Sequence, residues 1–183
     1  MTAAELTEAQ IERLLGIADR FEIRECVETY ARGVDRHDDD LLRDVFHSDA
    51  VDDHGEGRDM DEFVYWANNV VHAHLAAHMH HVTSHTAVVE GDVADAESYV
   101  LFVHRYKDGK TVHVAGGRYL DRLEKRDGVW RVLHRRVVVD YRYLADGSVH
   151  GDWDGYVKGT WGRSDPSYDL PLLSRLPHHD RVG

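Results

Sequence analysis

The sequence is poor in cysteine, with Cys26 alone among 183 residues. No intrachain disulfide can form, which favours a reducing compartment and a cytoplasmic protein. The first six residues contain neither a basic nor an apolar segment, so we expect no signal peptide. No apolar run approaches the roughly 20 residues of a membrane-spanning helix, and a membrane partner is therefore not expected.

Basic residues are also scarce, with 22 Lys and Arg against 34 Asp and Glu, a formal charge of -12. Such a charge argues against nucleic acid or an anionic membrane as a partner. The length and the 42% hydrophobic content suffice for one domain with a substantial core. All three prolines fall at position 166 or later, and residues 144–183 are predicted to form an irregular extension.

The first half of the chain has helical periodicity. Thr7 and Gln10 have the spacing of a capping box, and apolar residues then recur every three or four positions as far as Arg36, with a predicted break near Asp19. Asp35 lies near the end of this helix, where the helix dipole disfavours a carboxylate. We therefore expect a cationic or proton-sharing neighbour for it. A short helix at 41–46 and a long helix from about 59 to 80 are predicted next.

From His81 the period changes to two, which is typical of strands. Alternation places His81, His85 and Ala87 on one face of the first strand, and Gly116-Gly117 marks a bulge in the third. Helices followed by hairpin-connected strands predict an α+β fold with an antiparallel sheet. The strands are expected at 81–90, 94–106, 111–125 and 129–143.

Three segments carry a family resemblance: Tyr30–Asp35, His81–His85 with Gly91-Asp92, and Gly116–Asp121 with residues 126–132. In order and spacing they resemble the SnoaL-like branch of the nuclear transport factor 2-like superfamily, which includes scytalone dehydratase, a hexachlorocyclohexane dehydrochlorinase and bile acid 7α-dehydratase. The resemblance covers about residues 15–143 and implies one domain over 1–183. Its fold would be a curved antiparallel sheet wrapped on N-terminal helices, a cone with a pocket.

The resemblance also implies site residues by position. His81 would be the general base, with Asp35 orienting it and balancing its charge. Tyr30 and Arg135 would stabilise charge on oxygen, with Arg136 in place of Arg135 if the register slips by one. Two further residues are predicted to contact substrate: His85, on the face of His81, and Trp66, as part of an apolar lining. Without the resemblance, a single His or Asp is more often structural or solvated.

The predicted function is that of a cofactor-independent lyase on a hydrophobic aromatic or polycyclic small molecule. Water, halide or formaldehyde would be lost, the last as in the cleavage of lignin-derived diarylpropanes. Isomerisation or cyclisation in the same pocket stays open. So does a non-catalytic role, as a ligand-binding module or as a protein like the structural β subunit of dioxygenases. The family resemblance further implies a homodimer or homotrimer.

Fifteen histidines raise the question of a metal. His74 and His78 have the i, i+4 spacing of a zinc-binding helix. However, the glutamate of a His-Glu-x-x-His motif is missing and no cysteine ligand is near. The sequence therefore favours no metal, with the histidines on a solvated or protein-contacting helix face.

Overall fold

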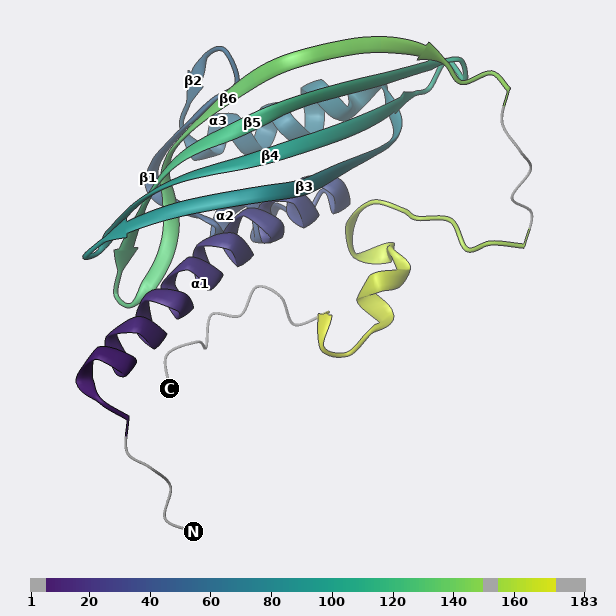
Figure 1. Ribbon diagram of the computed structural model, residues 1–183. Coiled ribbons are helices and arrows are strands. Elements are labelled where there is room, and N and C mark those ends of the chain that lie inside the picture. The colour runs from purple at the N-terminus through teal and green to yellow at the C-terminus, as the bar shows by residue number, and fades with distance from the viewer. Residues whose placement is uncertain (1–5, 150–154, 174–183) are drawn as a thin grey trace.

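The computed structural model describes residues 6–149 and 155–173 of the chain (Figure 1). The helices are α1 (Glu8–Arg36), α2 (Asp39–Asp44) and α3 (Met60–Tyr65), followed by the π-helical η1 (Trp66–Val71) and the 3-10 turns η2 (His72–His74), η3 (Gly162–Ser164) and η4 (Pro166–Asp169). The strands are β1 (Phe46–Asp53), β2 (Gly57–Arg58), β3 (Leu75–Glu90), β4 (Val93–Tyr106), β5 (Thr111–Arg126) and β6 (Val129–Asp146). No helix among the described residues is long and apolar enough to cross a membrane.

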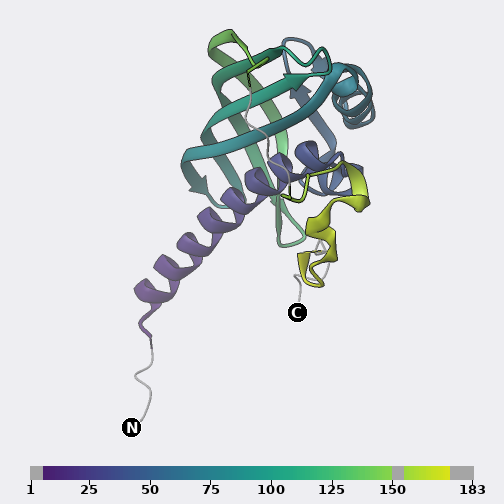
Figure 2. The same cartoon turned by 90° about the vertical axis from the view of Figure 1, so that its right-hand side faces the viewer.

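The six strands form one curved sheet in the order β2-β1-β6-β5-β4-β3. β3 to β6 are antiparallel neighbours, as predicted, whereas β1 pairs in parallel with β6, which the sequence did not indicate. The helix α1 runs across the hollow of the sheet beneath β3 and β4, and its N-terminal half projects beyond the sheet (Figures 1 and 2). The α+β cone is thereby confirmed.

The helix α1 begins with the predicted capping box, formed by Thr7 and Gln10. The break predicted near Asp19 is wrong, because the helix is continuous from Glu8 to Arg36. Asp19 accepts hydrogen bonds from Lys125 Nζ at 2.8 Å and Trp130 Nε1 at 2.9 Å, so its carboxylate is held against the β5–β6 hairpin and need not cap a new helix.

The helix that follows β2 ends earlier than predicted. η2 ends at His74, and β3 already begins at Leu75. An extra residue lies between Val82 and His85, where the pairing with β4 shifts register. This bulge reverses the alternation, so the prediction that His81 shares a face with His85 and Ala87 is wrong. Before the bulge the inner positions are His78, His80 and Val82, and after it they are His85, Ala87 and Val89.

A second irregularity, predicted from Gly116-Gly117, is confirmed by the shift of β5 against β6 at this point. A Cβ on Gly117 would lie 2.1 Å from the carbonyl oxygen of Val138, so only glycine fits there. Beneath these strands an apolar core joins α1, α3 and the sheet. Its largest fully buried apolar members are Ile23, Leu42, Phe63, Leu123, Val27 and Val132.

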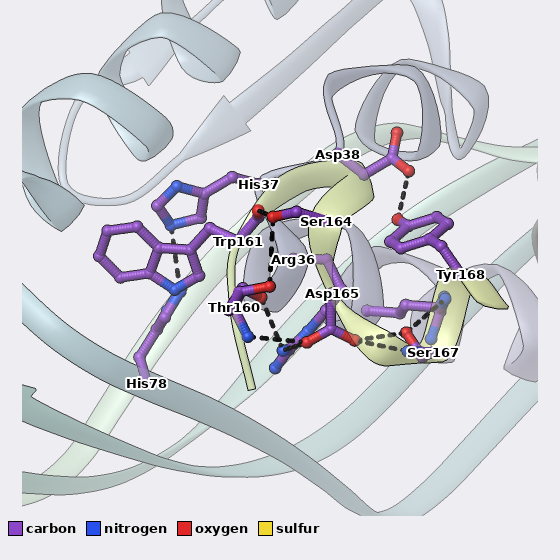
Figure 3. Close-up of polar contacts among 11 residues, drawn as sticks. Arg36, His37, Asp38, His78, Thr160, Trp161, Ser164, Asp165, Ser167 and Tyr168 are labelled. Atoms are coloured by element: carbon purple, nitrogen blue, oxygen red, sulfur yellow. Dashed lines mark hydrogen bonds and ion pairs between the residues drawn. The ribbon is translucent and has the colours of Figure 1, made fainter. Parts of the chain in front are cut away.

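Residues 155–173 return to the C-terminal end of α1 (Figures 1 and 3). Asp165 accepts a hydrogen bond from Arg36 Nη1 at 2.8 Å, and Ser167 Oγ accepts one from Arg32 Nη2 at 3.2 Å. The hydroxyl of Tyr168 donates to the carboxylate of Asp38. The irregular extension predicted from the prolines is therefore tied to the same helix end that carries Asp35.

Candidate functional site

The carboxylate of Asp35 has a histidine partner in β3. Asp35 Oδ1 lies 2.7 Å from His80 Nδ1, and Asp35 Oδ2 accepts the backbone N–H of His80 at 2.9 Å. The carboxylate is buried, and about 10% of the His80 side chain remains exposed. These contacts supply the proton-sharing neighbour that the position of Asp35 at the helix end required.

His81 was the predicted partner, and the structure places it differently. Its side chain is exposed on the opposite side of β3 from His80. The bulge between Val82 and His85 explains the difference of one residue, because strict alternation counted back from the later strand positions assigns the inner face to His81.

A groove of about 590 Å³ runs between α1 and β3. It has the size of a small-molecule site. Asp35, His80 and His81 all line it, so the dyad is at the wall of an accessible space. The remaining lining residues are Glu28, Ala31, Arg32, Arg36, Met79, Val82 and Thr83.

Tyr30 and Arg135 come together in the core, away from this groove. Arg135 is fully buried and forms two 2.7 Å hydrogen bonds to Asp121. Its guanidinium lies 4.1 Å from the ring centre of Tyr30 and 4.3 Å from that of Tyr119. Burial alone would lower the pKa of Arg135, but the Asp121 carboxylate raises it well above its ordinary value. Burial raises the pKa of Tyr30.

The two predicted substrate contacts lie elsewhere again. His85 faces inward, as predicted, and its Nδ1 is 2.8 Å from Ser98 Oγ, while burial lowers its pKa. Trp66 is half-buried, with its ring 5.3 Å from that of His54, and the guanidinium of Arg58 lies 4.4 Å from the indole centre. Neither residue lines the groove beside His80.

The structure also gathers histidines that sequence reasoning did not bring together. His37 follows the end of α1, His72 lies in η2 and His78 in β3, yet their rings are in contact. His104 of β4 pairs with His78 across the sheet, and Trp161 stacks on His37 at 4.1 Å between ring centres (Figure 3). Abundant histidine was the only signal for this cluster in the sequence.

The predicted helix face that would carry His74 and His78 together is wrong. His78 belongs to β3 and not to a helix, and His74 is exposed at the end of η2. The two side chains therefore do not share a helical turn.

Comparison with known proteins places this geometry in a family. Residues 16–136 match the SnoaL-like domain. Among curated proteins, none is similar in sequence. A type 2 hexachlorocyclohexane dehydrochlorinase (LinA) has a similar structure, with a TM-score of 0.70 and 23% identity over 79% of this chain and 99% of that one.

Two further solved structures share the fold. A putative scytalone dehydratase from Novosphingobium aromaticivorans has a TM-score of 0.62 and 18% identity, over 78% of this chain and 97% of that one. A nuclear transport factor 2-like protein from Salmonella enterica has a TM-score of 0.58 and 19% identity, over 75% and 96%. The chain thus belongs to the SnoaL-like domain family and has the nuclear transport factor 2-like fold.

Proposed function

We propose that this protein is a cofactor-independent lyase in which His80 is the general base and Asp35 its orienting carboxylate. The observation that carries the proposal is the double contact of Asp35 with the side chain and the backbone N–H of His80. It fixes the imidazole in one orientation at the wall of the groove, which is what a positioned base requires.

The contact also assigns the ring's protons. A carboxylate can only accept hydrogen bonds, so Nδ1 of His80 carries the proton and donates it to Asp35. The lone pair is then left on Nε2, which is the basic nitrogen. A positive charge that forms on this ring during proton transfer is stabilised by the adjacent carboxylate.

The reaction that fits this pair is an elimination. His80 Nε2 takes a proton from a carbon next to the bond that breaks, the C–H electron pair forms a double bond, and the leaving group departs with its own pair. The protonated imidazole can then return the proton to a departing hydroxyl, which releases water. The names of two structural neighbours, a dehydrochlorinase and a putative dehydratase, describe this class of reaction.

For the substrate we propose a hydrophobic aromatic or polycyclic small molecule. Ala31, Met79 and Val82 give the groove apolar wall, and its volume of about 590 Å³ suits one such molecule. Water and halide are the leaving groups to test for this step. Formaldehyde is the third product to test: its release would start with a proton taken from a hydroxyl, the O–H pair would form its C=O bond, and the pair of the broken C–C bond would stay on the other fragment. A homodimer or homotrimer in the cytoplasm stays our expectation for its assembly and location.

The experiment is a screen followed by three variants. Aromatic secondary alcohols, chlorinated cyclohexanes and diarylpropane diols are incubated with the protein, and the three released products are measured separately. On any substrate found, His80→Ala is expected to lower kcat by about 10²- to 10⁴-fold, the usual contribution of a general base. Asp35→Asn is expected to lower it by on the order of 100-fold, because the tautomer is no longer enforced.

His81→Ala is the matched control. His81 lines the same groove one residue along but is exposed and lies on the other face of β3. Its loss should change kcat by no more than a few-fold. A large loss in His81→Ala with normal turnover in His80→Ala would contradict the assignment. Binding of these compounds without turnover of any class would instead support a non-catalytic ligand-binding protein.

A further inference from the structure

Three imidazoles meet beside the C-terminal end of α1: His37 directly follows this helix, His72 lies in η2 and His78 in β3. His37 Nε2 lies 3.2 Å from His78 Nε2 (Figure 3), and the ring centres of His72 and His78 are 3.9 Å apart. One nitrogen from each of the three rings lies within 4.8 Å of the other two. His37 lies 35 positions before His72 in the sequence, so its convergence with His72 and His78 is a property of the fold.

These rings have unused nitrogens. His72 and His78 are 3% and 5% exposed, and the Nδ1 atom of each is buried without a hydrogen-bond partner in the described part of the chain. A buried polar atom without a partner costs about 1–3 kcal/mol. The unpartnered nitrogen of the buried His72 ring is therefore one that a bound ion could satisfy.

The spacing also suits a tetrahedral ion. With Zn–N bonds of about 2.0–2.1 Å, two nitrogens on one tetrahedral zinc are about 3.3 Å apart. The 3.2 Å between His37 Nε2 and His78 Nε2 is close to that edge. On the other side of the ring, His78 Nδ1 lies 3.8 Å from Asp35 Oδ1, which is too far for a hydrogen bond.

We propose that His37, His72 and His78 form a binding site for one divalent transition-metal ion, with zinc as the favoured ion. Three imidazoles leave a fourth position open, and Trp161 stacked on His37 shields the site from one side. The site is additional to the proposed elimination, which uses His80 and requires no metal.

A second group of three, Asp35 with His78 and His80, is also close enough to share an ion. We favour the histidine triad because both oxygens of Asp35 are already bonded to His80. The histidine triad contains His37 and His72, whereas the second group contains Asp35 and His80 in their place. Substitutions of His37, His72 and His80 therefore distinguish the two sites.

The test is zinc binding by the full chain after removal of metals with EDTA. Calorimetry and metal analysis should find one zinc per chain that survives gel filtration, and cobalt substitution should give the visible spectrum of a four-coordinate nitrogen site. His37→Ala, His72→Ala and His78→Ala should each weaken binding by on the order of 100-fold or more, exceeding the 10- to 100-fold effect of losing an outer partner.

His74→Ala is the matched control, since His74 is exposed in the same 3-10 turn as His72, and its zinc affinity should be unchanged. Absence of stoichiometric zinc in the wild-type chain would overturn the proposal without any variant having to fold. So would a loss of binding in His80→Ala together with normal binding in His37→Ala and His72→Ala. None of these readouts depends on turnover, so the elimination can fail while the zinc site stands, and the reverse.

Discussion

Two of the buried polar regions in the described part of the chain are built in opposite ways. Arg135 and Asp121 form an ion pair in which both carboxylate oxygens are used and two tyrosine rings cover the guanidinium. Among the described residues, Nη1 of Arg135 has no hydrogen-bond partner. His72 and His78 of the histidine triad are neutral because burial lowers their pKa, and each leaves a buried nitrogen without a partner in the described part of the chain.

The difference indicates what each region is for. A buried charge whose counter-charge lies beside it is neutralised within the chain, so the Arg135–Asp121 pair fits a structural role. A buried ring nitrogen without a partner is incomplete until something binds it. Arg135, which was predicted to stabilise charge on oxygen, belongs to the buried ion pair and lies away from the groove where Asp35 and His80 meet. The predictions below test this contrast, beginning with the largest effect.

Removing the arginine should cost the most. Arg135→Met leaves the Asp121 carboxylate buried and unpaired, and we expect the free energy of unfolding to fall by about 3–5 kcal/mol in urea denaturation. Arg136→Met is the control, because Arg136 is exposed and pairs with Asp53 at the surface. Its loss should cost less than about 1 kcal/mol. Equal losses in the two variants would refute a structural role for the buried pair.

Replacing a histidine of the triad should not lower the free energy of unfolding when metal is absent, in contrast to Arg135→Met. In EDTA, His72→Phe replaces a ring with an unpartnered nitrogen by an apolar ring, and stability should stay unchanged or rise by about 1 kcal/mol. His47→Phe is the comparison, since His47 is equally buried but its Nε2 bonds the carbonyl oxygen of Glu124 at 3.0 Å. That variant should lose about 1 kcal/mol. A larger loss in His72→Phe would break the contrast.

The attachment of the tail gives an effect on local opening rather than on global unfolding, and this effect depends on pH. Burial raises the pKa of Asp165, but hydrogen bonds from Ser167, Thr160 and Arg36 outweigh this and hold it well below its ordinary value. A carboxyl whose pKa is lowered on folding stabilises the fold above the unfolded value of about 3.9, and this contribution is lost as the pH falls further.

Asp165→Asn should therefore lower the free energy of local opening of residues 155–173 by about 1–2 kcal/mol at pH 7, measured by hydrogen exchange. The difference from wild type should shrink as the pH falls below about 3.9. Asp169→Asn, an exposed carboxylate of the same segment, serves as control and should match wild type. A difference that persists unchanged at low pH would show that the Asp165 charge does not hold the tail.

Local patterns in the sequence predicted much of the fold. The capping box at Thr7, the hairpin-connected strands and the bulge at Gly117 each depend on residues a few positions apart, and each is confirmed. The need of Asp35 for a proton-sharing neighbour was also local, because it follows from the helix dipole.

Which residue is the neighbour of Asp35 could not be predicted from local sequence. One extra residue in β3 moves the inner face from His81 to His80, and alternation alone carries no sign of a bulge without glycine. The histidine triad was still harder to predict from the sequence, because His37 lies 35 positions from His72 and contacts it only when α1 packs against the sheet. The separation of Arg135 from the groove depends on the same packing.

The central claim is that Asp35 holds His80 with its proton on Nδ1 and its lone pair on Nε2. Long-range ¹H–¹⁵N spectra of the imidazole, assigned by the signal missing in His80→Gln, measure this directly and need no substrate. We expect a protonated Nδ1 and a bare Nε2 in the wild-type protein, with that preference lost in Asp35→Asn. A His80 ring protonated at Nε2 with a bare Nδ1, unchanged in Asp35→Asn, would contradict the account.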